Sequence, residues 1–552
     1  MVGFSLLIVM FITLYMSKRM FLVKALILLL SMMLVSAWYI ANDFTGKGMD
    51  DSFLYTITNS VTGTPIFDNL RYIVILALLF SLYCFFIFHL RKKKNKKLIY
   101  DIAFILSAVC FFIKSEPAVN IITLYESNND FGEIEKDYII SNEIMNSTNG
   151  NYVFILAESL ERTFKDIDGV NYLENISKID NQIDFSNIGY VRGSGWTIAG
   201  HVNFMCGIPF IGTGNSASKI KTFLPKATCF TDIAKKSGYK NIYLSGTDIS
   251  FAGMKTFLKS HSFDEIIDLP TLGDKYPDEI KRNSWGLDDK VIFDEAFDMF
   301  IDESKNKKPF MMYISTINTH SPGYKSYSCE SHVADRYLDS VICEDIIISE
   351  FIKKIKESGY YDNTTIILLS DHGLMHWDKL INKDLKRTNL LTVFNKNITN
   401  DIISNEGTVL DQLPSALSAV SKKDESFGFG RSIYNKENSL KNLKNEYNMF
   451  SKSLWAHPSL NQKIKFNGKE KIEIGSMTFN LPICIYFDNK YEILDFGYED
   501  GIKERCENDI SKGVDEGIII AEKCDNKLCT KVYNNHHKTE KIINAGETLV
   551  IE

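Results

Sequence analysis

Four apolar stretches in the first 113 residues constrain the fold of this chain most strongly. They cover residues 2–16, 21–41, 72–90 and 98–113, with short polar segments between them. A helix needs roughly 20 apolar residues to cross a bilayer, and the second and third stretches are long enough. The first and fourth are shorter, and a buried amphipathic or interfacial helix is the alternative for each. We expect residues 1–114 to form a membrane anchor with about four transmembrane helices.

Basic residues beside these stretches predict the orientation of the anchor. Lys18, Arg19 and Lys24 border the first two stretches, and a basic run at 91–97 separates the last two. Such clusters stay in the cytoplasm, so four spans would put everything after Lys114 on the other side of the membrane. A cleaved signal peptide is not expected, because the first charges follow the first apolar stretch instead of preceding it.

Charge divides the chain at the same point. The whole chain of 552 residues has a formal charge of −7. Through Lys114 there are 12 Lys and Arg against five Asp and Glu, a net of +7, and the remainder has 50 basic and 64 acidic residues, a net of −14. No nucleic-acid partner is expected, because the soluble part lacks the basic excess that such binding needs. The basic run at 91–97 is better explained as a determinant of topology.

Cysteine usage follows the same division. Cys84 and Cys110 lie in the anchor, and eight cysteines follow it. An extracytoplasmic location makes disulfides between sequence neighbours chemically reasonable. The pairs of this kind are Cys206 with Cys229, Cys329 with Cys343, and Cys524 with Cys529, and the alternative is free buried thiols.

The pattern from Asn151 onward indicates an α/β domain. Short apolar runs alternate with amphipathic segments, which is typical of buried strands with covering helices. The strands are predicted at Tyr152–Ala157, Asn241–Ser245, Phe310–Ser315 and Thr365–Ser370, and helices at 229–237 and Ala334–Ser358. We expect a linker at 115–150, the α/β domain at 151–440 and a small β-rich module at 441–552.

Polar side chains follow three of the predicted strands. Glu158 follows the first strand, His320 comes shortly after the third, and Asp371 and His372 follow the fourth. Ligands of open α/β sheets gather beyond the carboxyl ends of the strands. Two carboxylates and an imidazole suit Mn²⁺, Mg²⁺ or Zn²⁺. A carboxylate after a strand is more often a helix cap or a solvated turn, but the three positions together favour a metal site.

A hydroxyl nucleophile for such a site is offered by the segment Gly-Ser-Gly-Trp-Thr-Ile-Ala-Gly at 193–200. Glycines let the backbone turn sharply and approach a phosphate closely. Thr197 is the candidate nucleophile. The alternative is a surface turn in which this threonine only caps the following helix.

These motifs together resemble a known family. The segments Asn-Tyr-Val-Phe-Ile-Leu-Ala-Glu-Ser at 151–159, Gly-Ser-Gly-Trp-Thr-Ile-Ala-Gly at 193–200 and Ser-Asp-His-Gly at 370–373 occur in the order and spacing of one branch of the alkaline phosphatase/sulfatase superfamily. That branch holds lipoteichoic acid synthase and phosphoglycerol transferase I, which are bacterial membrane enzymes. The resemblance implies an alkaline phosphatase/sulfatase-like sandwich with a central, mostly parallel sheet. It also implies a multi-pass protein of the bacterial inner membrane with its catalytic domain on the periplasmic side.

The resemblance assigns roles by position. It implies that Glu158, Thr197, Asp371 and His372 bind one divalent metal ion, most readily Mn²⁺, with Zn²⁺ and Mg²⁺ as alternatives. Thr197 would be the nucleophile, and His320 would bind substrate or transfer a proton. The residues expected to contact substrate are Trp196, Lys255 and Trp285. One departure weakens the role of Lys255, because Met254 stands directly after the Phe-Ala-Gly motif at 251–253, where a basic residue is expected.

The predicted function is transfer of phosphoglycerol from phosphatidylglycerol to an extracytoplasmic glycan, such as a periplasmic glucan, through a covalent threonine intermediate. The main alternative is a phosphoethanolamine transferase that acts on lipid A or a surface glycan. A sulfatase is less favoured, because none of the ten cysteines stands in a Cys-x-Pro-x-Arg context. A non-catalytic scaffold for anionic glycans would be expected to have lost its metal ligands, which this sequence retains.

Overall fold

The computed structural model describes most of the chain. The described residues are 2–17, 19–45, 48–58, 70–90, 98–126, 137–140, 142–147, 150–210, 223–224, 227–381, 384–434, 463–466, 468, 471–474, 477–487, 491, 493–497, 502–512, 517–525, 527–534 and 537–551. They form two compact units. The first comprises Met1–Asn215, Thr228–Met254 and His261–Lys452, and the second comprises Ser216–Ala227, Lys255–Ser260 and Ser453–Glu552.

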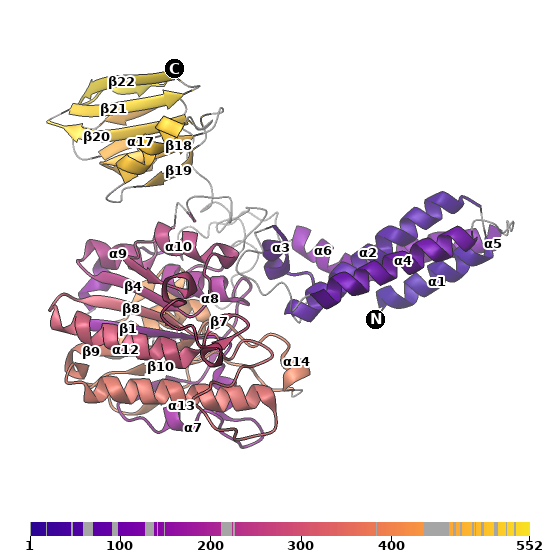
Figure 1. Ribbon diagram of the computed structural model, residues 1–552, viewed down its shortest axis with the longest axis horizontal. Helices are drawn as coiled ribbons and strands as arrows, with labels where there is room; N and C mark the ends of the chain where they lie inside the picture. The colour runs from indigo at the N-terminus through magenta and orange to yellow at the C-terminus, as the bar shows by residue number, and fades with distance from the viewer. Residues whose placement is uncertain are drawn as a thin grey trace. The chain divides into compact units, whose positions relative to one another are not determined.

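The regular elements in the described part of the N-terminal segment are helices (Figure 1). The helices are α1 (Val2–Met16), α2 (Phe21–Thr45), α3 (Asp51–Thr58), α4 (Leu70–Leu90), α5 (Leu98–Lys114) and α6 (Glu116–Glu126). By length and composition, Phe21–Asp43 and α4 can cross a membrane. The α5 and α6 helices are bent by 49° and can count as a third span, whereas α1 is shorter. The basic run at 91–97, on which the predicted orientation depends, lies outside the described residues.

Part of the predicted linker lies among the described residues. Its first part forms α6, which starts with Pro117 in its first turn, where the missing N–H of proline costs no hydrogen bond. A short 3₁₀ helix follows at Asn142–Ser147. Ile139 also pairs with Gly428 through backbone hydrogen bonds of 2.9 and 2.7 Å, so the end of the linker is attached to the α/β domain.

An eight-stranded mixed sheet forms the centre of the α/β domain. The strand order is β11-β2-β10-β9-β1-β8-β4-β5. These strands are, in chain order, β1 (Asn151–Ala157), β2 (Gln182–Phe185), β4 (Lys240–Ser245), β5 (Glu265–Ile267), β8 (Phe310–Ser315), β9 (Thr364–Ser370), β10 (Leu391–Phe394) and β11 (Asp401–Ile403). Every neighbouring pair is parallel except the two pairs that β10 makes. The four predicted strands and the mostly parallel sheet are therefore confirmed.

Helices cover both faces of this sheet (Figure 1). Alternate residues of β1, Val153 and Ile155, pack in one apolar core with residues of α12 (Asp289–Lys305) and α13 (Arg336–Glu357). The intervening Phe154 points to the other face, where its ring lies 5.4 Å from that of Phe204 in α8 (Thr197–Cys206). Helices α9 (Phe230–Lys236) and α15 (Gln412–Ser421) pack against β4 and β10. The result is the predicted three-layer sandwich.

The C-terminal module is a small β-sandwich. One sheet has the order β17-β16-β15-β23 and the other β19-β18-β20-β21-β22. The strands are β15 (Lys463–Phe466), β16 (Lys471–Ile474), β17 (Met477–Asn480), β18 (Ile483–Phe487), β19 (Ile493–Gly497), β20 (Gly517–Cys524), β21 (Lys527–Asn534), β22 (His537–Asn544) and β23 (Thr548–Val550). Apolar side chains from both sheets share one core. The module also has a helix that the sequence did not reveal, α17 (Ile502–Lys512), which packs on the second sheet near Cys506 and Ile510.

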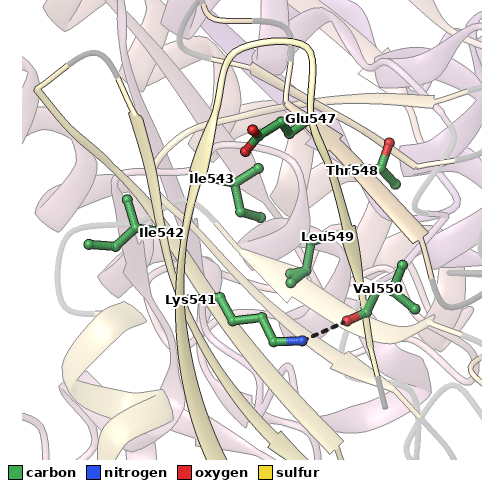
Figure 2. Close-up of a pocket in the computed structure, with 7 residues that line it drawn as sticks. All are labelled: Lys541, Ile542, Ile543, Glu547, Thr548, Leu549 and Val550. Carbon is green, nitrogen blue, oxygen red and sulfur yellow. Dashed lines mark hydrogen bonds between the residues drawn. The ribbon is translucent and has the colours of Figure 1, made fainter.

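An open hollow lies between β22 and β23 of this module, and Figure 2 shows the residues that line it. Lys541 spans it with a hydrogen bond of 3.4 Å to the carbonyl of Val550. The two groups of metal-ligating side chains found among the described residues both lie in the first unit. The candidate functional site is therefore sought there.

Four disulfides join all eight cysteines that follow the anchor. Three are the predicted pairs, Cys206–Cys229, Cys329–Cys343 and Cys524–Cys529. The fourth, Cys484–Cys506, connects β18 to α17. Cys84 and Cys110 are free.

We predict that peptide mapping without reductant, on protein from cells quenched with an alkylating agent, will recover these four linked pairs. Only Cys84 and Cys110 should carry the alkyl group, because thiols paired in an oxidising compartment are protected. Alkylation of any of the other eight cysteines in natively folded protein would contradict both the pairing and the predicted orientation.

Candidate metal and nucleophile site

Strand register brings the first three candidate ligands together. β1 and β9 are parallel neighbours, and Ala157 lies opposite Ser370. The next residues, Glu158 and Asp371, therefore leave the sheet side by side, followed by His372. One ligand atom from each of these three residues lies within 4.8 Å of the other two. All three side chains are buried, with about 1 to 3% exposed.

Helix α8 brings Thr197 to the same place. Thr197 is the first residue of the helix, and its hydroxyl donates to Glu158 Oε2 at 3.2 Å. It is not the N-cap, a position that Trp196 occupies without a side-chain bond. Gly200, one turn further, lies so close to β9 that a Cβ atom there would be 1.9 Å from the carbonyl oxygen of Asp371. The close approach of helix and strand therefore requires glycine at this position.

Hydrogen bonds orient Asp371 and His372 and leave one atom of each available. Asp371 Oδ1 accepts from the backbone N–H groups of Ser159 and His372 at 3.0 and 2.7 Å. His372 Nδ1 lies 2.8 Å from the carbonyl of Gly373, which assigns the ring proton to Nδ1 and makes Nε2 the ligand atom. Asp371 Oδ2 and His372 Nε2 are buried and have no hydrogen bond of normal geometry in the described part of the chain. Buried polar atoms rarely lack a partner, so these two fit a bound cation.

The electrostatics of the cluster also favour a cation. Burial raises the pKa of Asp371, and the charge of Glu158 adds to this, giving a value of about 8. Burial acts on Glu158 in the same direction, but the nearby His372 and His320 outweigh it and lower the pKa of Glu158. Two buried carboxylates this close cannot both ionise without a compensating positive charge. Although burial lowers the pKa of His372, the two carboxylates outweigh it and raise that pKa to about 10, so its proton supplies part of this charge. A divalent ion bound by Glu158, Asp371, His372 and the Thr197 hydroxyl would take the place of that proton.

His320 lies on the other side of β1. It follows β8, and its imidazole lies against Trp285 with the ring centroids 4.5 Å apart and the ring planes tilted by 52°. The Nδ1 atom lies 2.9 Å from the carbonyl of Ser321, which leaves Nε2 available to substrate. Trp196, beside the nucleophile, is 8% exposed, and its indole N–H has no acceptor among the residues that the structure describes. Lys255 belongs to the second compact unit, so its contact with substrate stays a prediction.

Sequence reasoning did not find a group of buried acids that holds the segment before His320. Asp289 accepts from the backbone N–H groups of Ile317 and Asn318 at 2.9 and 2.6 Å. Glu344 of α13 is fully buried, and neither of its oxygens has a standard hydrogen bond in the described structure. Burial raises the pKa of Asp289 to about 8, and burial with the nearby Asp289 raises that of Glu344. Nothing in the local sequence distinguishes these acids from solvated ones.

The second group of potential ligands, Cys229, Asp232 and His261, is not a metal site. Cys229 is in a disulfide with Cys206. Asp232 caps α9 by accepting from the Cys229 N–H at 2.9 Å, and the same carboxylate oxygen lies 2.9 Å from His261 Nδ1.

Comparison with known proteins gives consistent matches. Residues 150–422 match the sulfatase family, and residues 2–129 match the N-terminal domain of phosphoglycerol transferase I. Phosphoglycerol transferase I of Xanthomonas campestris pv. campestris is 29% identical over 510 residues, which cover 86% of this chain and 71% of that protein. The Citrobacter koseri protein of the same name is 32% identical over 422 residues, which cover 71% of this chain and 54% of that protein. A lipoteichoic acid synthase structure from Listeria monocytogenes is 16% identical, with a TM-score of 0.45, over 70% of this chain and 94% of that chain.

We predict that Gly200→Ala weakens Mn²⁺ binding, because the new methyl group would push α8 away from Asp371. The loss should be about 10- to 100-fold in affinity, the usual effect of disturbing the support of metal ligands. Titration calorimetry measures it. The control is Gly189→Ala, where the nearest atom to the new Cβ is 3.5 Å away. Equal Mn²⁺ affinity in the two variants would contradict the close approach of α8.

We predict that the Glu344→Gln variant loses less stability than the wild type as the pH rises. The raised pKa values keep Asp289 and Glu344 protonated in the folded chain above about pH 4, where unfolded carboxyls ionise. The folded state then binds more protons than the unfolded state, so stability falls as the pH rises towards 8. Between pH 5 and pH 8, Tm in detergent should fall by about 2–4 °C less in the variant than in the wild type. Glu350→Gln, at an exposed position of the same helix, is the control, and parallel curves for all three proteins would contradict the assignment.

Proposed function

We propose that this chain, which belongs to the sulfatase-like transferase family, moves a phosphoglycerol group from phosphatidylglycerol to an extracytoplasmic glycan. The observation that carries the proposal is the hydroxyl of Thr197, 3.2 Å from Glu158, in a buried cluster with Asp371 and His372. The relatives named phosphoglycerol transferase I support the group transferred. The glycan acceptor, a periplasmic glucan or a similar chain, is part of the proposal.

The cofactor in this proposal is one divalent ion, Mn²⁺ in the first place and Zn²⁺ or Mg²⁺ otherwise. Asp371 and His372 would hold it through the two atoms that the hydrogen bonds leave available, and Glu158 and the Thr197 hydroxyl would complete the set of ligands. When bound, such an ion lowers the pKa of a coordinated hydroxyl and offsets negative charge on a phosphodiester.

The chain's own residues would perform two displacements at phosphorus. In the first, Thr197 Oγ1 loses its proton towards Glu158 and forms a bond to phosphorus, while the bond from phosphorus to the diacylglycerol oxygen breaks. His320, through its available Nε2, gives a proton to the departing oxygen. In the second, a glycan hydroxyl gives its proton to His320 and forms a bond to phosphorus, while the bond from phosphorus to Thr197 Oγ1 breaks and Glu158 returns the proton to Oγ1. Trp196 and Trp285 would contact the phosphoglycerol group between these steps.

The anchor supports a lipid donor. Tethering the domain to a bilayer raises the effective concentration of headgroups at the site without any affinity of the domain for lipid. We place the protein in the inner membrane of a bacterium as a multi-pass protein, with residues 151–440 as the catalytic domain on the periplasmic side. The four disulfides support that side, because cytosolic thiols are kept reduced.

We predict that the wild-type protein releases diacylglycerol from phosphatidylglycerol vesicles that contain Mn²⁺. When the reaction is quenched before an acceptor is added, the protein should carry a phosphoglycerol adduct on Thr197. Thr197→Ala should lack the adduct and lose at least about 1,000-fold in the rate of diacylglycerol release, because it removes the hydroxyl that donates to Glu158 Oε2. Peptide mass spectrometry and a lipid assay measure the two results. Thr271→Ala, at an exposed threonine, is the control.

The same assay separates the headgroups. Release of diacylglycerol from phosphatidylethanolamine vesicles instead of phosphatidylglycerol vesicles would contradict the proposed donor and would favour a phosphoethanolamine transferase. Normal release by Thr197→Ala would contradict the nucleophile.

A further inference from the structure

Helix α3 contacts the α/β domain although it lies in the sequence between the two clearest membrane spans. The span of α2 ends at Asp43, and α3 begins at Asp51. The seven residues between them can bridge at most about 25 Å in an extended chain. Whatever α3 binds is therefore held close to the end of a membrane span.

The first contact is an ion pair between Asp51 and Arg192. Arg192 Nε donates to Asp51 Oδ2 at 2.6 Å, and a guanidinium NH₂ group donates to Oδ1 at 2.8 Å. The Asp51 side chain is only 9% exposed. Asp50 caps the helix separately by accepting from the Phe53 N–H at 3.0 Å, so the Asp51 carboxylate is not needed for that cap. A two-bond pair of this kind fixes orientation as well as distance.

The second contact is the side chain of Tyr55, which is 1% exposed. Its ring lies 5.1 Å from that of Phe210 and 6.2 Å from that of Trp196. Its hydroxyl donates to the carbonyl of Ala252 at 2.6 Å. Tyr55 therefore joins two segments of the α/β domain that are more than 40 residues apart in the sequence.

Both segments lead directly to groups of the candidate site. Trp196 precedes Thr197 and is the N-cap of α8. Ala252, in the left-handed conformation with φ of 53°, follows Phe251, whose ring lies 6.2 Å from that of Trp285. Trp285 in turn contacts the ring of His320. Through Trp196, Tyr55 is connected to the nucleophile Thr197, and through the Ala252 segment it is connected to the proposed proton donor His320.

We propose that Asp51 and Tyr55 are positioning residues, and that α3 holds the Trp196–Thr197 segment and the Phe251–Gly253 segment at a fixed separation. Thr197 and His320 then act on the same phosphorus, and the active geometry depends on the membrane anchor. This inference rests on the proposed roles of Thr197 and His320. Misplacement of a reacting group by about 1 Å can cost up to 100-fold in rate, so a loss of one contact should lower kcat more than it changes substrate binding.

The test uses the full-length protein in phosphatidylglycerol vesicles with Mn²⁺ and follows diacylglycerol release. Asp51→Asn should lower kcat by about 10-fold and leave KM and the number of Mn²⁺ ions bound per chain unchanged. The exchanged pair Asp51→Arg with Arg192→Asp should regain kcat to within about threefold of wild type, because it restores the ion pair.

The second contact is tested by Tyr55→Phe, which keeps the ring and removes only the hydrogen bond to Ala252. A fall of about threefold in kcat is expected. Asp302→Asn, which breaks an exposed ion pair with Lys305 in the last turn of α12, is the control and should match wild type.

Three results with Asp51→Asn and the exchanged pair would overturn the proposal. The first is a wild-type kcat in Asp51→Asn. The second is a kcat that stays low in the exchanged pair although its thermal unfolding matches that of the wild type. The third is a fall in kcat that is accompanied by an equal loss of bound Mn²⁺. The last result would mean that α3 only supports folding. If Asp51→Asn lowers thermal stability, a second variant, Arg192→Lys, takes its place. It keeps the positive charge but removes the two-bond geometry, so kcat should fall by the same factor. Wild-type kcat in Arg192→Lys would also overturn the proposal. Failure of the proposed function would differ from all of these, because Thr197→Ala would then keep its activity.

Discussion

The parallel pairing of β1 with β9 is the interaction on which the rest of the site depends. Because Ala157 lies opposite Ser370, the next residue of each strand enters the same space at the edge of the sheet. Glu158 and Asp371 are thereby buried beside each other, which is unfavourable for two carboxylates alone. Thr197 reaches this pair only because Gly200 lets α8 pack against the backbone of β9. A shift of one residue in the register would move Glu158 by about 3.3 Å relative to Asp371 and His372.

Local charge at the site contrasts with the charge of the whole soluble part. That part has a net charge of −14, which repels an anionic lipid surface. A cation among Glu158, Asp371 and His372 would provide the attraction that the average composition does not. Helix α3 adds a mechanical connection, since Asp51 and Tyr55 attach the same domain to a segment between two membrane spans. Attraction of the headgroup and proximity to the membrane thus arise from different features.

Much of the fold could be predicted from the sequence because its signals are local. The four buried strands are continuous apolar runs, and their ends match the structure to within one residue. Glu158, Thr197, Asp371 and His372 could be named because motifs mark them, and the structure places them together. Three disulfides joined sequence neighbours, whereas Cys484–Cys506 depends on how α17 packs on its sheet.

The features that were missed depend on contacts between distant parts of the chain. Nothing in the sequence around Tyr55 indicates that its ring packs on Trp196, and nothing around Glu344 shows that the carboxyl is buried. The role of Gly200 could have been suspected from its place in the Thr-Ile-Ala-Gly segment, but its reason is the carbonyl of Asp371, 171 residues later. Such packing is decided by the tertiary structure and not by local propensity.

The central claim is that one divalent ion binds at the nucleophile, and anomalous diffraction at the manganese edge tests it most directly. Crystals grown with Mn²⁺ should give one strong peak in the α/β domain, bounded by Glu158, Asp371, His372 and the hydroxyl of Thr197. A peak surrounded by other side chains, or no peak between Glu158 and His372 when Mn²⁺ is saturating, would contradict the account.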